Sequence, residues 1–506
     1  MWNLSQFENN TAVIDDCGRN LTYAELQEQG EELVSAIAHE NGPVSGGSAR
    51  CLVFNMCANV LGSLVGYISF LNGGVVPAML KGDLDEELLE NLYKTYEPAY
   101  IWTSEESWSG LSEQREENGA EVYDSEATAK PHSARPLFRD LPCVYNACGY
   151  VLLKTPFGLK TKLHPNLALL LTTSGSTGSP KFVRQSYANI RANTDSIVEY
   201  LGLTQDERPV TDLPMNYTYG ISIINTHIDV GATILLTEKG LMQKEFWTFF
   251  KEKKATSIAG VPYTYEMLKR LRFMRMDFPY LKTMTQAGGK LLPELHKEFA
   301  EWAAAAGKKF VVMYGACEAT ARMGYLPADK AVEKQGSMGI PIPGGRFELI
   351  DVNDEGITEP DTVGELVYYG ENVTMGYATS AADLTKGDER GGRYATGDMA
   401  KRDAEGYYYI VGRKKRFLKI FGNRVNLDDC ERMLKAEFPS GDLACGGVDD
   451  RLYIFAVNED DLSAMREYLA GKTGLNPSAF VTQHLESIPH NESGKVLYRE
   501  LEKYYS

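Results

Sequence analysis

The stretch best suited to bind an anion covers residues 172–181, which read Thr-Thr-Ser-Gly-Ser-Thr-Gly-Ser-Pro-Lys after the apolar run 169–171. Glycine permits positive φ and close approach of a ligand. Such a loop can turn N–H and hydroxyl groups toward one point, and Lys181 adds a compact positive charge. The pattern predicts a phosphate-binding loop. It lacks the Gly-x4-Gly-Lys-Ser/Thr spacing of the NTPases, and a plain surface loop is the alternative.

Three further polar segments follow predicted strands or turns, at 286–290, 313–320 and 394–398. Open parallel sheets bind ligands at the carboxyl ends of their strands. Tyr314 offers a face for a base, Glu318 suits a hard cation such as Mg²⁺, and Asp398 can accept bonds from two ribose hydroxyls. Arg413 precedes an apparent domain boundary. Each residue alone could equally be a turn residue or a member of a surface salt bridge.

Composition narrows the class of protein. The chain has 506 residues and a net charge of −17, which argues against nucleic acid or an anionic membrane as the main partner. The most apolar stretch, 60–80, is interrupted by glycines and a proline, so no membrane span is expected. The N-terminus lacks a basic region followed by an apolar core, so no signal peptide is expected.

The cysteines favour a reducing compartment. There are eight of them, and none form a Cys-x-x-Cys pair. Neither a zinc site nor a disulfide framework is expected, and the protein is predicted to be cytoplasmic.

Strand and helix patterns alternate over the first 320 residues, which predicts parallel-sheet α/β subdomains. The pair Thr22 and Glu25 forms a capping box that starts an amphipathic helix. Further helices are expected over 60–71, 86–96, 186–201, 221–230, 246–253, 263–271 and 292–306. Strands are expected over 50–55, 74–77, 99–103, 166–172, 233–236, 257–261, 283–287 and 309–314. Residues 104–140 are polar and read as surface structure with a short strand.

Two composition changes suggest further units. Strands over 347–351, 364–369 and 406–411, separated by glycine-rich turns, predict a β-rich subdomain at about 330–413. A basic run follows at 413–416, and Asn426 can cap a helix over 427–438. The expected organisation is a large N-terminal domain, 1–413, and a small α+β C-terminal domain, 414–506.

Taken together, the chain resembles the adenylate-forming superfamily, which includes acyl- and aryl-CoA synthetases, adenylation domains of peptide synthetases, and luciferases. Six separated motifs in the family's order and spacing are far more specific than any one glycine motif. The motifs lie at 172–181, 314–318, 364–366 with 376–377, 394–398 with 406–407, 412–424, and 494–495.

The resemblance implies a two-step reaction. A carboxylate attacks the α-phosphorus of ATP to give acyl-AMP and pyrophosphate, and a thiol then displaces AMP. ATP and Mg²⁺ are implied, with CoA or the phosphopantetheine of a free-standing acyl carrier protein as acceptor. Because the sequence ends soon after Lys495, a separate acceptor is expected, with the enzyme a monomer or homodimer.

The resemblance also implies roles for individual residues. Lys495 would be the adenylation lysine and Glu318 would position Mg²⁺. Asp398 would bind the ribose with help from Arg413. Tyr314 would stack on adenine. Other nucleotide-contacting positions would be Thr173, Ser174, Gly175, Ser176, Thr177, Gly178 and Lys181 around the phosphates, Gly288 and Gly289 beside the base, and Gly315 and Cys317 in the Tyr314 segment.

A hinge is implied at Lys415, about which the C-terminal domain would rotate between the two half-reactions. The chain departs from the family at two positions. Cys317 stands where Thr or Ser usually contacts the α-phosphate, and a thiol is the weaker donor. Asn426 stands where Glu is frequent.

The acid would bind near Tyr217, Tyr219, Gly288 and Met313, which favour an apolar or aromatic acid. Residues 214–225 contain no acidic side chain, which disfavours an α-amino acid. Two alternatives stay open. One is an amino-acid adenylation enzyme that loads a carrier protein. The other is a catalytically degraded nucleotide-binding protein.

Overall fold

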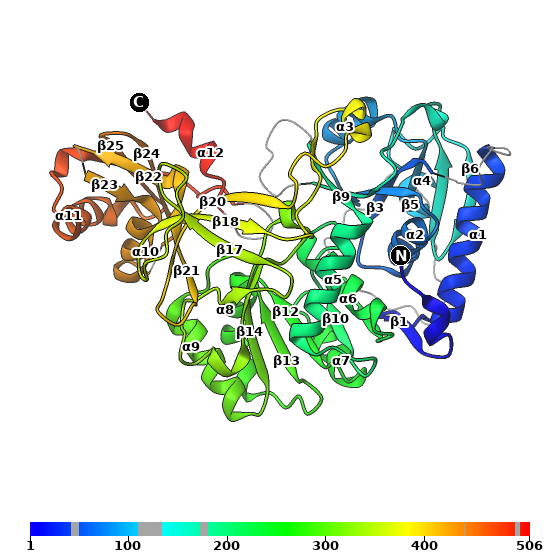
Figure 1. Ribbon diagram of the computed structural model, residues 1–506, viewed down its shortest axis with the longest axis horizontal. Helices are drawn as coiled ribbons and strands as arrows, with labels where there is room; N and C mark the ends of the chain where they lie inside the picture. Colours follow the sequence, from blue (N-terminus) through cyan, green and yellow to red (C-terminus); the bar gives the residue numbers. More distant parts are fainter. Residues whose placement is uncertain are drawn as a thin grey trace, which may run out of the picture.

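The computed structural model describes residues 1–41, 50–109, 134–172, 181–421, 423–439, 441–490 and 496–505. Five sheets organise these residues. Figure 1 shows the two largest sheets below and to the right, with the four-stranded sheet above the lower one. The elements that follow residue 416 gather at the upper left of this view.

A nine-stranded sheet carries two of the predicted ligand-binding loops. Its six central strands run parallel, so β13 and β14 end at the same edge. Antiparallel strands complete both sides. The order is β16 (Ile340–Pro341), β15 (Gly324–Leu326), β14 (Lys309–Tyr314), β13 (Thr283–Gln286), β12 (Ser257–Gly260), β10 (Pro209–Thr211), β11 (Ile234–Leu236), β1 (Thr11–Asp15) and β2 (Asn20–Thr22).

An eight-stranded sheet lies beside it. Its strand β8 ends at Thr172, where the predicted phosphate-binding loop begins in the sequence. Four central strands are parallel, and both edges are antiparallel. The order is β19 (Gly376–Ala378), β9 (Phe182–Ser186), β8 (Leu167–Thr172), β4 (Val76–Lys81), β3 (Leu52–Cys57), β5 (Tyr100–Ser104), β7 (Tyr150–Lys154) and β6 (Cys143–Ala147).

Three smaller sheets account for the rest of the chain. An antiparallel sheet has the order β17 (Arg346–Ile350), β18 (Gly364–Tyr369), β20 (Arg393–Arg402), β21 (Tyr408–Arg413). It is followed by the hairpin β22 (Phe417–Ile420) and β23 (Asn423–Asn426). The last sheet has the order β24 (Leu443–Val448), β25 (Arg451–Ala456), β26 (Phe480–His484).

Helices cover the sheets and bury apolar faces against them. The nine-stranded sheet packs on an aromatic core that includes Phe246, Phe250, Phe299 and Phe310. The helices are α1 (Tyr23–Asn41), α2 (Leu61–Asn72), α3 (Glu86–Tyr96), α4 (Glu105–Ser109), α5 (Tyr187–Leu201), α6 (Thr218–Asp229), α7 (Lys244–Glu252), α8 (Pro262–Arg270), α9 (Pro293–Ala305), α10 (Leu427–Glu437), α11 (Leu462–Thr473) and α12 (Tyr498–Leu501).

Two predicted caps are confirmed. Thr22 N–H donates to Glu25 Oε2 at 2.7 Å, and Glu25 N–H donates to Thr22 Oγ1 at 3.2 Å, so α1 begins with a capping box. Asn426 Oδ1 accepts from Asp428 N–H at 3.0 Å at the start of α10.

The predicted α/β class is confirmed, and several details are corrected. The strand expected at 50–55 lies at Leu52–Cys57, and the strand expected at 406–411 is β21. Within the predicted surface segment 104–140, Ser104 ends strand β5 and helix α4 follows it, and residues 110–133 lie outside the described residues. Strands β6, β7, β9 and β20 were not expected. Strand β9 contains Arg184 and Gln185, and both are buried with hydrogen-bond partners for their polar groups. These polar residues interrupt the apolar pattern by which a buried strand is predicted.

Candidate active site

Three predicted residues meet at the carboxyl end of β14. Tyr314 donates its hydroxyl to Asp398 Oδ2 at 2.5 Å. Asp398 Oδ1 pairs with Arg413 Nε at 2.9 Å, because these residues face each other across β20 and β21. Burial and the carboxylate of Asp398 raise the pKa of the Tyr314 phenol, which therefore remains a donor. The cluster joins an aromatic ring, a carboxylate and a cation.

A second cluster surrounds Glu318 in the short turn Cys317–Ala319. Tyr377 donates its hydroxyl to Glu318 Oε1 at 2.6 Å. Lys181 Nζ lies 4.1 Å from the centroid of the Tyr377 ring, and the guanidinium carbon of Arg390 lies 4.9 Å from it. Burial and the nearby Glu318 raise the pKa of Tyr377 to about 12. One carboxylate and two cations thus adjoin a single neutral phenol.

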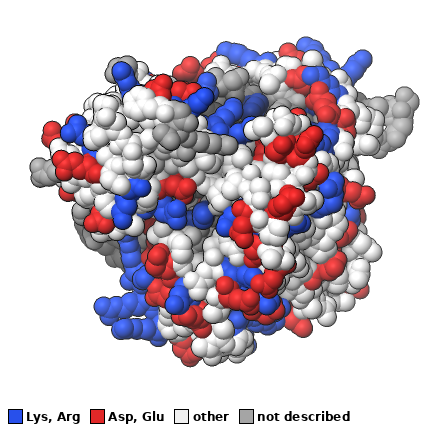
Figure 2. Space-filling view, turned by 60° about the vertical axis from the view of Figure 1, so that its left-hand side comes forward, with Lys and Arg blue, Asp and Glu red and all other residues white. Residues whose placement is uncertain are grey.

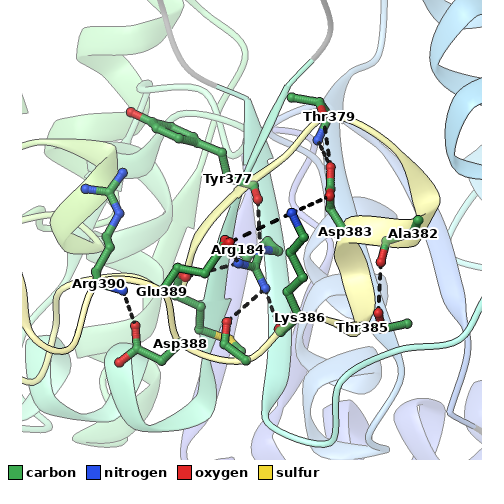
Figure 3. Close-up of polar contacts among 12 residues, drawn as sticks. Arg184, Tyr377, Thr379, Ala382, Asp383, Thr385, Lys386, Asp388, Glu389 and Arg390 are labelled. Carbon is green, nitrogen blue, oxygen red and sulfur yellow. Dashed lines mark hydrogen bonds and ion pairs between the residues drawn. The ribbon is translucent and has the colours of Figure 1, made fainter.

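The segment that carries Tyr377 and Arg390 is fastened by Arg184 on β9. This arginine is fully buried and donates to the carbonyl oxygens of Tyr377, at 3.0 Å, and Met375, at 3.1 Å. Its Nη2 also pairs with Glu389 Oε2 at 2.5 Å. Figure 3 shows Tyr377 and Arg390 on one side of Arg184, with Asp383 and Thr379 on the other. Arg184 therefore holds this loop against the eight-stranded sheet.

The turn between Tyr314 and Glu318 is tightly packed. A Cβ at Gly315 would come within 1.7 Å of the Ala321 carbonyl oxygen, so only glycine fits there. Cys317 Sγ lies 4.0 Å from the carbonyl oxygen of Thr172, at the end of β8. Burial is the largest cause that raises the pKa of the Cys317 thiol, with the Glu318 charge next. The thiol therefore stays protonated and unreactive.

The loop after β13 lies beside Tyr217. Gly288 has a φ of +84°, and a Cβ there would lie 2.7 Å from the Tyr217 hydroxyl. A Cβ at Gly289 would come within 3.0 Å of Pro262 Cγ. The predicted neighbours Tyr217 and Gly288 are therefore in contact distance.

Tyr219 and Met313 are buried behind Tyr217. Tyr219 shares a 2.8 Å hydrogen bond with Thr285 Oγ1, and Tyr217 packs edge-on to its ring. Arg322, which sequence reasoning did not select, stacks on the Tyr219 ring at 4.0 Å and donates Nε–H to Met313 Sδ at 3.3 Å. The predicted substrate residues thus share a site with a buried cation.

Several predicted residues cannot be placed. Thr173, Ser174, Gly175, Ser176, Thr177, Gly178 and Lys495 lie outside the described residues. Lys415 lies in the short turn Lys414–Arg416, between β21 and β22. Beside it, Lys414 Nζ pairs with Glu365 Oε2 at 2.5 Å.

Sequence reasoning missed Arg184, Arg322 and Arg390. The signal in the sequence was faint: Arg184 interrupts an otherwise strand-like run, and Arg322 sits between small and apolar residues. Arg390 lies in a polar stretch that reads as a surface turn.

The surface charges, the cysteines and the helices give further information on what the protein can bind. Figure 2 shows acidic and basic side chains interspersed over the face it presents. All eight cysteines are free thiols. Within the described part of the chain, His, Cys, Asp and Glu form no cluster of three or more that could hold a metal ion. No helix among those residues combines the length and hydropathy needed to cross a membrane.

The sequence profile of the AMP-binding enzyme family matches residues 2–378. The chain belongs to this family. The match covers the Tyr314 and Glu318 segment and the Tyr377 strand, and the predicted resemblance is confirmed. Proteins similar to this chain include oxalate–CoA ligase of Arabidopsis thaliana, 26% identical over 67% of each chain. Another is 2-succinylbenzoate–CoA ligase of Enterococcus faecalis, 25% identical over 65% of this chain and 68% of the other.

Solved structures of AMP-binding enzymes share the fold. O-succinylbenzoate coenzyme A synthetase (MenE) from Bacillus subtilis, in complex with AMP, matches with a TM-score of 0.75 and 18% identity, over 98% of this chain and 97% of the other. ATP-bound MatB from Rhodopseudomonas palustris matches with a TM-score of 0.72 and 20% identity, over 99% and 97%. The similarity of fold therefore extends through the C-terminal elements.

Proposed function

We propose that this protein is an ATP-dependent acid–thiol ligase. The acid's carboxylate oxygen attacks the α-phosphorus of ATP, the bond to the bridging oxygen breaks, and pyrophosphate leaves. A thiol then attacks the acyl carbon and AMP leaves. Membership of the AMP-binding family and relatives named as CoA ligases support this activity.

The observation that carries the proposal is the pairing of two clusters on one short segment. Tyr314, with Asp398 and Arg413, offers groups suited to an adenosine. Four residues further along, Glu318 with Lys181 and Arg390 offers groups suited to phosphates and a cation. A nucleotide laid along this segment would meet both.

At the adenosine end, Tyr314 would stack on the base, with Gly288 and Gly289 at its edge. Asp398 would accept hydrogen bonds from the ribose hydroxyls, and Arg413 would hold its carboxylate in place. Gly315 would let the backbone approach the nucleotide closely.

At the phosphate end, the loop containing Thr173, Ser174, Gly175, Ser176, Thr177 and Gly178 would hold the β- and γ-phosphates. Lys181 would offset their negative charge, and Arg390 is suited to the same task. Cys317 would face the α-phosphate as a weak donor.

Magnesium fits Glu318. One carboxylate oxygen accepts the Tyr377 hydroxyl, and a hard carboxylate ligand suits Mg²⁺. When bound, the ion would neutralise charge on the phosphates. Tyr377 would fix the orientation of the carboxylate.

Lys495 would contact the acid and the α-phosphate oxygens during the first step. We propose a boundary between domains 1–413 and 414–506, a β-rich subdomain at about 330–413, and a hinge at Lys415. Rotation at the hinge would withdraw Lys495 and let the thiol reach the acyl-AMP.

CoA is the proposed acceptor, because the relatives are named for it. A free-standing carrier protein is the second candidate. The free thiols favour a cytoplasmic location. A monomer or homodimer would suffice for the chemistry.

The test is ATP–pyrophosphate exchange across a panel of carboxylic acids. At least one acid should support exchange, and Lys495→Ala should abolish it. AMP release with CoA, compared with carrier protein, then identifies the acceptor. Absence of exchange in a folded, ATP-binding protein would reject the ligase and favour a degraded nucleotide-binding protein.

A further inference from the structure

Arg322 is a buried cation with only neutral partners. Its side chain belongs to a residue that is 4% exposed. The guanidinium lies on the face of Tyr219, 4.0 Å from the ring centroid, and donates Nε–H to Met313 Sδ at 3.3 Å. The phenol of Tyr200 is also within hydrogen-bonding reach. A thioether is a weak acceptor, and none of these partners carries a negative charge.

The other buried arginines of the described residues, Arg184 and Arg135, each form an ion pair with a carboxylate. Arg184 pairs with Glu389 at 2.5 Å, and Arg135 pairs with Glu86 at 2.9 Å. In the described residues no carboxylate forms an ion pair with Arg322. A buried charge without a counter-ion is energetically unfavourable, and a cation–π contact offsets only part of that cost. The missing anion is therefore expected from a ligand.

The position of Arg322 fits that expectation. It lines a cavity together with Met313, Thr285, Ile223 and Ala259. Tyr219, on which it stacks, packs edge-on against Tyr217 with the ring centroids 6.3 Å apart. The Tyr217 hydroxyl in turn adjoins Gly288. The cation thus lies one aromatic ring beyond the residue that faces the Gly288 loop.

Glu207 also lines this cavity, but its carboxylate is bound to other partners. Glu207 Oε1 pairs with Lys282 Nζ at 3.0 Å, and its Oε2 accepts the Thr256 hydroxyl at 2.6 Å. Its charge is already compensated. The cavity as a whole therefore offers an anion one uncompensated positive charge, at Arg322.

We propose that Arg322 binds a second carboxylate of the acid substrate, so that the enzyme activates short dicarboxylic acids. This rests on the proposed ligase function. It replaces the apolar or aromatic acid that the sequence favoured. The reacting carboxylate would lie at the Gly288 loop, and the second would lie against the guanidinium in a charge-assisted pair.

The test compares dicarboxylic acids of increasing length with their monomethyl esters in the exchange assay. The wild type should favour one diacid over its ester by about 10–100-fold in kcat/KM, which corresponds to one charge-assisted hydrogen-bonded pair. Arg322→Met should remove that preference while activity with the ester is kept or raised. Arg322→Lys should retain part of it. Arg346→Met is the matched control, since Arg346 stacks on Tyr369 at 4.1 Å on the surface.

Two results would overturn the inference. One is a wild type that prefers the ester or a simple monoacid. The other is an Arg322→Met protein, folded by circular dichroism, that loses diacid and ester activity equally, since that indicates a structural role. If no acid supports exchange, the ligase function fails by itself. Calorimetric binding of diacids to wild type and Arg322→Lys then still decides whether Arg322 binds them.

Discussion

At the scale of single residues, the buried carboxylate of Asp398 joins two side chains of the candidate site. It accepts from Tyr314 at 2.5 Å and pairs with Arg413 at 2.9 Å while only 6% exposed. Removing a charge from such a cluster leaves its partners unsatisfied. The residue therefore combines a structural and a proposed ligand-binding role, and these can be separated.

Asp398→Asn is expected to raise KM for ATP by about 10–100-fold, because a neutral amide is a weaker acceptor for the ribose hydroxyls. Exchange kinetics at varied ATP concentrations measure this. Tyr314→Phe is the matched variant: it removes the bond to Asp398 and keeps the ring, so a smaller rise is expected. Equal KM values for ATP in wild type and Asp398→Asn would contradict ribose binding by this residue.

The partly buried Asp212 makes stability depend on pH. Burial raises the pKa of its carboxyl to about 6 from an ordinary value near 3.8, and Oδ1 has no hydrogen-bond partner. Between these values the folded state holds a proton that the unfolded state has released. The stability that this group contributes therefore falls as pH rises from about 4 and is lost once pH has passed through about 6.

Asp212→Asn removes this charge. It should raise Tm by about 2–4 °C at pH 7.5, roughly 1 kcal/mol in a unit of this size, and by less at pH 5, where Asp212 is protonated. Thermal unfolding at both values measures the difference. Asp206→Asn, at an exposed position nearby, is the control. A gain of the same size at both pH values would refute the assigned cause.

At the scale of elements, Asn426 joins helix α10 to strand β21. Its Oδ1 accepts from Asp428 N–H, and its Nδ2 donates to the Val411 carbonyl oxygen at 2.6 Å and to Asp429 Oδ2 at 3.0 Å. Asn426, which stands where Glu is frequent in the family, thus caps helix α10 and also contacts strand β21.

Asn426→Ala should destabilise α10 by about 1–2 kcal/mol, since both the cap and the buried donor bonds are lost. Hydrogen exchange of the α10 amides measures the effect. Asp85→Ala, which removes the single cap bond of α3 to Leu88 N–H, should cost less. An α10 protected as well in the variant as in wild type would show that Asn426 contributes nothing to the helix.

Element types were largely predictable from sequence, and the misses have a physical pattern. Helix α3 and strands β14 and β18 have the predicted bounds, because each has a clear apolar period and defined ends. Strand β9 was missed because Arg184 and Gln185 are both buried, and their hydrogen-bond partners lie far along the chain. Tertiary contacts decide such cases.

The residues of the candidate site also differ in how well the sequence predicts them. Tyr314, Asp398 and Arg413 are recognisable from local motifs, and the structure places them in contact. The burial of Arg322 depends on Tyr219 and Met313, which come from separate elements. No local pattern distinguishes such an arginine from one on the surface.

At the scale of the whole molecule, the proposed hinge can be tested by restricting it. Proline fixes φ near −65° and removes the N–H. Lys415→Pro should leave ATP–pyrophosphate exchange within about threefold of wild type and lower thioester formation by roughly a hundredfold, because only the second step needs rotation.

The two half-reactions are measured separately, by exchange and by CoA-dependent AMP release. Lys415→Ala removes the same charge but leaves the backbone free, so both steps should persist. A proline variant that forms thioester at the wild-type rate would exclude a hinge at this residue.

The short separation between Arg413 and Lys415 has a mechanical consequence. Arg413 pairs with Asp398, and Lys415 follows two residues later. A rotation that begins at Lys415 would have its fulcrum at the ribose end of the nucleotide. Displacement would increase with distance from that point. The adenosine would therefore move little, and the part of the C-terminal domain farthest from Lys415 would move most.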